Sequence, residues 1–229
     1  MPKHVGIVAC SAEGAALCYR TLCTEAPALM GPHQHPEVSM HTFPLGRYME
    51  CLYRDDWDSI ADLMAESARK LASIGAEFCI CPDNTIHQAF DRATRYSPIP
   101  WLHIAEVVAD EAARRGFRHL GVLGTRYLME GPVYPEKLTP RGIAHTIPTS
   151  TQRARINTII FDELVNGRFL PESCRYFVDT ITDLKQQGCD AVVLGCTEIP
   201  LIISDADSPL PTLDSTRLLA RAALRKALE

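Results

Sequence analysis

Two short segments of the chain combine thiol, carboxylate, amide and hydroxyl side chains at a spacing suited to proton transfer. They are CPDNTIH, with Asp83, Asn84 and Thr85, and GCTEIP, with Cys196, Thr197 and Glu198. Thiols and carboxylates both take up and return protons. Two such groups on opposite sides of one carbon can invert its configuration, because one face loses a proton while the other gains one.

The two segments occupy equivalent positions in an internal repeat. HVGIVACS at 4–11 matches HLGVLGTR at 119–126, an offset of 115 residues (119 minus 4). GAEFCICPDNTIH at 75–87 matches GCDAVVLGCTEIP at 188–200, an offset of 113 (188 minus 75). Near-equal offsets are typical of a duplicated lobe. In this register Asp83 is equivalent to Cys196.

Short apolar runs bounded by Gly or Pro alternate with segments of helical period, which favours an α/β fold with parallel sheets. We expect strands at 4–9, 38–43, 77–81, 118–123 and 190–194, and helices at 12–24, 57–74, 104–115, 153–166, 172–187 and 214–228. Both chemical segments then follow the carboxyl ends of strands, where open parallel sheets bind ligands.

The predicted architecture is two similar Rossmann-like lobes related by an internal pseudo-twofold duplication. We expect the first lobe over 1–98, completed by a C-terminal helix at 212–229, and the second over 99–211. The active site is expected where the two lobes meet.

At CPDNTIH and GCTEIP the chain resembles the aspartate/glutamate racemase superfamily, whose members carry a Cys-Asn-Thr element in the first half and Gly-Cys-Thr-Glu in the second. The resemblance extends to the GIVACSAEGAA opening and to GFRHLGVLGT before the second lobe. It implies a racemase or epimerase of a small amino acid, with an acidic one favoured. It also implies catalysis without a metal or pyridoxal phosphate, and a homodimer.

The resemblance also implies residue roles. Cys196 becomes one acid/base, and the position of Asp83 becomes the other. The candidates for substrate binding are Asn84, Thr85, Thr125 and Thr197, with Glu198, Ser11 and, for a distal carboxylate, Arg47.

The sequence departs from the family where the first cysteine is usual, because Asp83 stands there. Cys81 lies two residues earlier, but Pro82 favours ending the strand, so we expect Asp83 to face the ligand. An ordinary carboxylate is ionised at about pH 7 and cannot donate a proton. Racemisation in both directions therefore requires burial or a negative substrate to protonate Asp83.

This departure leaves two alternatives open. One is a cofactor-free decarboxylase or isomerase of a small dicarboxylic acid that uses Cys196 alone. The other is a catalytically silent protein that binds a small acid.

Each candidate residue also has a structural interpretation. Cys196 could be an ordinary buried cysteine, and Asp83 could cap a helix, as could the three threonines. We expect His87 to orient its loop through a backbone hydrogen bond. We expect Cys79 and Cys81 to pack in a buried strand, and the HQHP stretch at 33–36 to form a loop.

Composition narrows the class of protein. Hydrophobic residues make up 46% and charged residues 22% of the 229 residues, which is ordinary for a globular protein. The net charge is −5 with both signs mixed, so neither nucleic acid nor a membrane is an expected partner. Nine cysteines without paired C-x-x-C elements or a signal-peptide pattern favour reduced thiols and a cytoplasmic protein.

Overall fold

The computed structural model describes residues 1–229, which form two α/β units. The first unit comprises Met1–Val107 with Thr216–Glu229, and the second comprises Val108–Ser215. The sequence places the end of the first lobe at residue 98, nine residues before Val107 (107 minus 98), and the end of the second lobe at residue 211, four residues before Ser215 (215 minus 211). The first unit extends further because the short strand β4 (Trp101–Leu102) pairs with its sheet.

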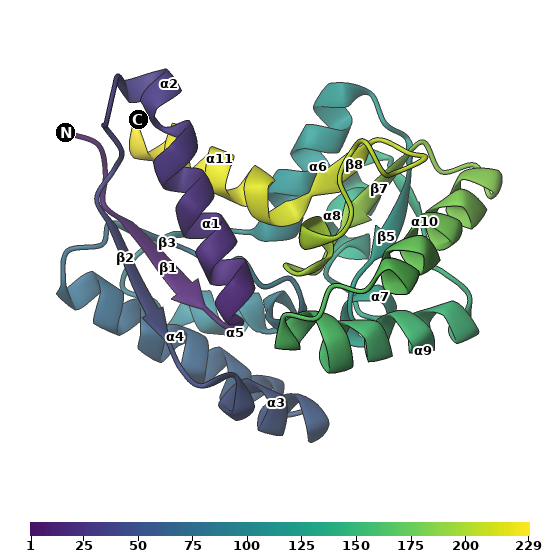
Figure 1. The fold of residues 1–229 in the computed structure, drawn as a ribbon. Helices are drawn as coiled ribbons and strands as arrows, with labels where there is room; N and C mark the ends of the chain where they lie inside the picture. The colour runs from purple at the N-terminus through teal and green to yellow at the C-terminus, as the bar shows by residue number, and fades with distance from the viewer. The chain divides into compact units, whose positions relative to one another are not determined.

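The first unit is built on a parallel sheet in the order β2-β1-β3-β4, of which Figure 1 labels β1, β2 and β3. Its other strands are β1 (Val5–Ala9), β2 (Val38–Thr42) and β3 (Phe78–Ile80). Alternate strand residues face opposite sides. Val5 and Ile7 pack with α1 (Ala12–Glu25) and α11 (Ser215–Ala227), whereas Val8 packs with α3 (Leu45–Tyr53) and α4 (Trp57–Ser73).

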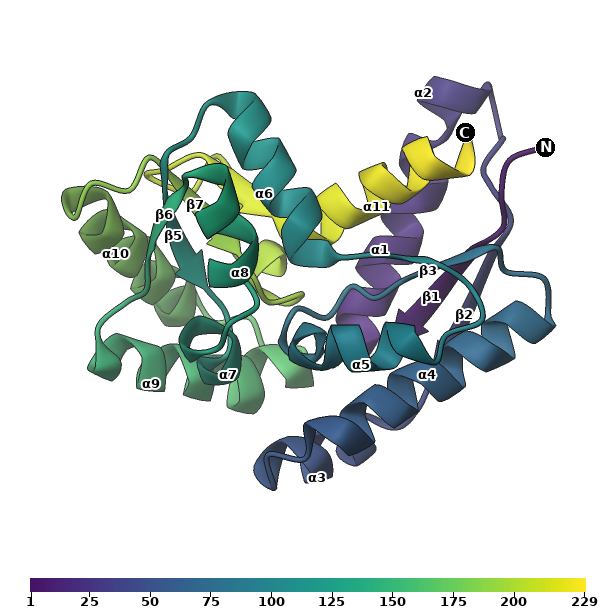
Figure 2. The ribbon, with the colours of Figure 1, turned by 180° about the vertical axis from the view of Figure 1, so that it is seen from behind.

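The second unit repeats this plan with a parallel sheet in the order β6-β5-β7-β8. The strands are β5 (His119–Leu123), β6 (Ala144–Thr146), β7 (Ala191–Leu194) and β8 (Thr212–Asp214). α9 (Ser150–Thr158) and α10 (Pro171–Gln186) pack on one face of the sheet through a core that includes Ile156, Phe177 and Val192. Figure 2 shows α8 (Pro135–Leu138) on the other face.

Strand pairing reproduces the sequence repeat residue by residue. Gly6 pairs with Cys79 in the first sheet, and Gly121 pairs with Val192 in the second. These pairs are separated by 115 (121 minus 6) and 113 (192 minus 79) residues, the two offsets found in the sequence. The prediction of two similar lobes with parallel sheets is confirmed.

The five expected strands and most expected helices are present, with ends within one or two residues. The expected helix 153–166 is interrupted, because α9 passes into a π-turn at Ile159–Glu163 and then a 3-10 turn at Leu164–Asn166. The Asn166 side chain donates to the carbonyls of Phe161 and Asp162, which stabilises this ending.

The sequence did not predict several shorter elements. Besides α3, α8 and the strands β4, β6 and β8, these are α2 (Pro27–Met30), α5 (Phe90–Arg95), α7 (Arg126–Glu130) and 3-10 turns at Thr85–Ala89, Thr139–Arg141 and Ile199–Leu201. α6 (Ile104–Arg115) has the bounds that the sequence predicts. None of the helices combines the length and the apolar character needed to cross a bilayer.

None of the nine cysteines forms a disulfide, and all but Cys23 and Cys174 are buried. Cys79 and Cys81 are fully buried in the first core, as expected for packing residues. Burial raises the pKa of the Cys79 thiol to about 12 and holds that of Cys81 well above its ordinary value. Both thiols therefore remain protonated at neutral pH.

Candidate active site

The carboxyl edge of the first sheet presents the loops that follow β1 and β3. Cys10 and Ser11 come directly after β1, and Ser11 caps α1 by accepting a hydrogen bond from the backbone N–H of Gly14 at 3.3 Å. Asp83, Asn84 and the 3-10 turn follow β3. Because parallel strands end at the same edge, Ser11 and Asp83 belong to one surface of the first unit.

The Asp83 loop is held from both its side chain and its main chain. Asp83 Oδ1 accepts a hydrogen bond from Ile86 N–H at 3.1 Å, and the Asp83 carbonyl oxygen accepts one from His87 Nδ1 at 2.6 Å. His87 Nε2 accepts from Ile104 N–H at 3.2 Å, so the ring carries its proton on Nδ1. The predicted role of His87 in orienting the loop is confirmed.

The contact between Asp83 and Ile86 does not remove Asp83 from solvent. Asp83 stays partly exposed, whereas Asn84 and Thr85 are buried at 2% and 7% exposure. Asn84, not Asp83, is the N-cap of the 3-10 turn, so Asp83 closes the turn instead of capping a helix, and this contact is compatible with binding a ligand.

Two glycines allow the second sheet to present Cys196 directly at its edge. Gly195 N–H donates to the Leu123 carbonyl oxygen at 2.8 Å, and a Cβ on Gly195 would lie 2.7 Å from that oxygen. A Cβ on Gly124 would lie 3.1 Å from the Gly195 carbonyl oxygen. The backbones approach too closely here for side chains, which explains the glycine before Cys196 in physical terms.

Cys196 is part of a compact hydrogen-bonded group with its two neighbours. Its Sγ donates to Glu198 Oε2 at 3.0 Å, and Thr197 Oγ1 donates to the same oxygen at 2.6 Å. Glu198 is 2% exposed, and its buried Oε1 has no hydrogen-bond partner. Buried carboxylate oxygens ordinarily have partners, so Oε1 is left able to accept a further hydrogen bond.

Thr125 ends the loop after β5 at the same edge of the second sheet. It caps α7 by accepting from Leu128 N–H at 3.2 Å and is 7% exposed. The predicted residues thus divide into two groups, each on one carboxyl edge. The first unit carries Ser11, Asp83, Asn84 and Thr85, and the second carries Thr125, Cys196, Thr197 and Glu198.

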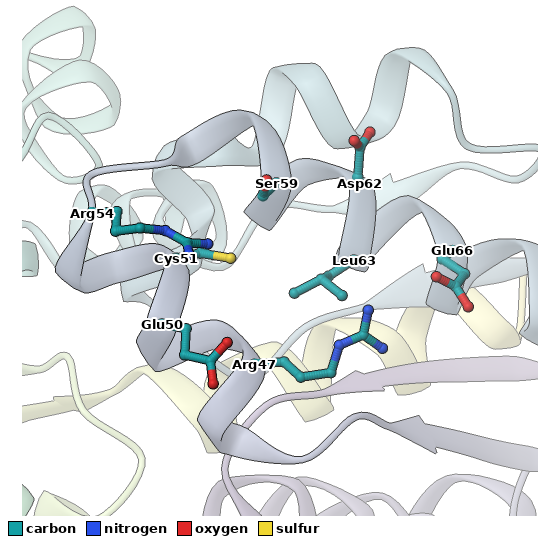
Figure 3. A pocket seen from close by; sticks show the side chains of 8 residues that line it. All are labelled: Arg47, Glu50, Cys51, Arg54, Ser59, Asp62, Leu63 and Glu66. Atoms are coloured by element: carbon teal, nitrogen blue, oxygen red, sulfur yellow. The ribbon is translucent and has the colours of Figure 1, made fainter.

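Arg47 lies in different surroundings from the other candidates of the first unit. Its guanidinium carbon is 4.3 Å from the centroid of the Phe43 ring. Figure 3 shows Arg47 extended toward Leu63 and Glu66, and it lines a cavity of about 300 Å³ between α3 and α4. The role of Arg47 in binding a distal carboxylate stays a prediction.

Sequence reasoning missed Tyr48, which lies on the inner face of α3. It is fully buried in the same core as Cys10 and Cys81. The spacing of Leu45, Tyr48 and Leu52 at i, i+3 and i+7 is the helical signal that would have placed Tyr48 on a core-facing surface.

Two duplicated parallel-sheet units, each ending in a cluster of small polar and ionisable side chains, define a two-lobed α/β protein, and such edges are where open parallel sheets ordinarily bind ligands. The family model for Asp/Glu/hydantoin racemases matches residues 7–223. The chain belongs to this family, which places it among the amino-acid racemases, a class of isomerases.

Several proteins of known sequence or structure are similar to this chain. A Yersinia pestis structure assigned to the Asp/Glu racemases is 30% identical, with a TM-score of 0.90 and coverage of 99% of this chain and 100% of that one. An aspartate racemase homologue from Pyrococcus horikoshii is 26% identical, with a TM-score of 0.85 and full coverage of both chains. A broad specificity amino-acid racemase of Bacillus subtilis is 22% identical over 83% of this chain and 81% of its own length.

Proposed function

We propose that this chain racemises a small, acidic amino acid without a cofactor, with Cys196 and Asp83 exchanging the α-proton. The observation that carries the proposal is the Cys196 thiol, held by Glu198 at the carboxyl edge of the second sheet. The repeat register gives Asp83 the equivalent position in the first sheet. One acid/base group on each of two equivalent edges is what inversion requires.

The hydrogen-bond donors favour a particular starting state. The Cys196 thiol donates to a carboxylate, so it carries its proton at rest. In one direction Asp83 takes the α-proton as a carboxylate, and Cys196 delivers its own proton to the opposite face. The products are the inverted amino acid, protonated Asp83 and the Cys196 thiolate. The opposite enantiomer reacts with this second state by the reverse transfers.

The remaining candidates serve binding. We assign Asn84, Thr85, Thr125 and Thr197 to the α-carboxylate and amino group, supported by their burial at the carboxyl edges that carry Asp83 and Cys196. Ser11 and Thr125 occupy helix caps after the first strand of each unit, so their hydroxyls lie beside backbone N–H groups that attract anions. We keep Glu198 as a substrate contact through Oε1, and Arg47 as a candidate for a distal carboxylate.

Two further parts of the proposal concern the whole protein. We propose a homodimer, supported by family membership. We also propose a cytoplasmic location, because nine cysteines without paired C-x-x-C elements favour reduced thiols.

The test is proton exchange in deuterium oxide. Separate L- and D-amino acids and small dicarboxylic acids are incubated with the wild-type chain, Cys196→Ala and Asp83→Asn, and α-deuteration and optical rotation are followed. We expect inversion with deuteration in the wild-type chain, and at least a 100-fold loss in both variants, at the lower end of the usual contribution of an acid/base group (roughly 10²-fold to 10⁴-fold).

The same experiment separates the alternatives. Deuterium in a decarboxylated or isomerised product, with Asp83→Asn active, identifies a one-sided enzyme that uses Cys196 alone. Binding without any exchange identifies a silent binding protein. Full inversion by Cys196→Ala contradicts the proposed chemistry.

A further inference from the structure

Tyr48 carries a polar group that the fold buries without satisfying. The side chain is fully buried, and its hydroxyl makes no hydrogen bond. Buried tyrosine hydroxyls usually find a partner, because an unsatisfied one loses its hydration without compensation. A phenylalanine would fill the same space without that cost, so the hydroxyl calls for an explanation.

The position of Tyr48 relates it to the carboxyl edge of the first sheet. α3 begins at Leu45, three residues after β2 ends at Thr42, and Thr42 pairs with Ala9 at the end of β1. Tyr48 packs in one core cluster with Cys10, the residue after β1. The first turn of α3 therefore brings the phenol beside the loops that carry the candidate site.

The electrostatics of the phenol agree with this placement. Burial raises the pKa of Tyr48 well above its ordinary value, and the nearby Cys10, Cys81 and Asp83 add to the shift, while Ser67 opposes it. The phenol therefore stays protonated and can donate a hydrogen bond. Ser67 lies near the phenol and forms a hydrogen bond with His41 Nδ1 at 3.0 Å, while the Tyr48 hydroxyl itself has no hydrogen-bond partner.

We propose that the Tyr48 hydroxyl donates a hydrogen bond to the side-chain carboxylate of the substrate and so selects acidic amino acids. This inference rests on the proposed function and identifies a binding residue for it. Its basis is the unpaired, buried donor on the inner face of α3, close to Cys10 and Asp83. Arg47, the adjacent residue, instead stacks on Phe43 beside the cavity between α3 and α4.

The test compares Tyr48→Phe with Tyr53→Phe, the same substitution on the same helix at a residue that is 73% exposed. The probes are L-aspartate, L-glutamate and L-2-aminobutyrate, which lacks a side-chain oxygen. Dissociation constants are measured by calorimetry, and kcat/KM by α-proton exchange.

We expect Tyr48→Phe to weaken the binding of the preferred acidic amino acid about 10-fold to 100-fold, the usual effect of one hydrogen bond to a charged group. The affinity for L-2-aminobutyrate should change by less than about threefold, and Tyr53→Phe should resemble the wild-type chain with every probe. Without ligand, Tyr48→Phe should unfold at the same temperature as the wild-type chain or higher, because it removes an unsatisfied polar group.

Three results would overturn the inference. The first is that Tyr48→Phe and the wild-type chain bind acidic amino acids equally well, and the second is that the wild-type chain does not bind acidic amino acids. The third is that ligand-free Tyr48→Phe unfolds at a lower temperature than the wild-type chain, which would indicate an internal partner for the hydroxyl. If the wild-type chain binds but does not exchange protons, the proposed racemisation fails while the role of Tyr48 in binding is still decided by the dissociation constants.

Discussion

Replacing Glu198 by glutamine tests the hydrogen-bonded group around Cys196. The amide oxygen of the introduced glutamine can still accept from the thiol and from Thr197, so the change removes mainly the negative charge. With Cys196 Sγ 3.0 Å from Glu198 Oε2, a thiolate and a carboxylate repel by about 1.4 kcal/mol even at the dielectric constant of water, ~80. At an effective dielectric constant of ~20 the repulsion is roughly four times larger.

The expected result is faster alkylation of Cys196 in Glu198→Gln, because the thiolate is the reactive form. A repulsion of about 1.4 kcal/mol corresponds to a rate about 10-fold higher at a fixed pH near neutrality. The assay is a time course with iodoacetamide, with the Cys196 peptide quantified by mass spectrometry. Cys174 serves as an internal reference, since it is half-buried and its Sγ donates to the Ile202 carbonyl oxygen instead.

Glu136→Gln is the matched control, because Glu136 is exposed on α8 of the same unit. It should leave the alkylation rates of Cys196 and Cys174 unchanged. Equal Cys196 rates in Glu198→Gln and the wild-type chain, with the Cys174 reference constant, would refute the inferred coupling between the thiol and the carboxylate.

Two further predictions concern stability, measured by urea unfolding. Gly195→Ala should destabilise the chain by about 1–3 kcal/mol, because the new Cβ would lie 2.7 Å from the Leu123 carbonyl oxygen. The control Gly46→Ala, in α3 with open space around it, should stabilise the chain by about 0.5–1 kcal/mol. Equal effects of the two substitutions would contradict the close approach at Gly195. Burial lowers the pKa of His41 below its ordinary value of about 6.5, so the unfolded chain takes up this proton first as the pH falls. The stabilisation from neutral His41 is therefore complete above about pH 6.5 and lost below it. His41→Gln should make the free energy of unfolding depend less on pH between about pH 7 and about pH 5.5. His33→Gln, in an exposed loop, should leave the pH dependence of the wild-type chain unchanged.

The central strands could be predicted from the sequence because they are short, largely apolar runs. β1 and β7 are buried at every position, so their pattern needs no tertiary context. The edge strands β4 and β6 are two and three residues long and only partly buried or exposed, so nothing in their sequence separates them from loops. Their pairing is imposed by the neighbouring central strand.

The candidate site was predictable in its positions but not in its contacts. The repeat register placed Asp83 and Cys196 at equivalent strand ends, because register is a property of the sequence. The hydrogen bond from Cys196 to Glu198 depends on the tight backbone turn after Gly195, which brings residues 196 and 198 together. The Tyr48 hydroxyl lacks a hydrogen-bond partner because of how distant segments pack around it, and a local sequence pattern cannot predict that packing.

The two edges share a scaffold but differ in where they place their carboxylate. In the second unit the thiol of Cys196 holds the proposed reacting position, and Glu198, two residues further along, accepts a hydrogen bond from it. In the register of the repeat, Asp83 stands at the position of Cys196 and Thr85 at that of Glu198. The first edge therefore offers a carboxylate held by a backbone N–H, and the second offers a thiol held by a carboxylate.

This asymmetry gives each edge a different resting proton load. A carboxylate that accepts a backbone N–H is favoured in its ionised form, whereas a thiol that donates to a carboxylate is favoured in its protonated form. In the proposed mechanism, one edge is thereby prepared to take a proton and the other to give one before any substrate arrives. The two positions are equivalent in the repeat, and the difference between Asp83 and Cys196 makes their proposed chemistry complementary rather than identical.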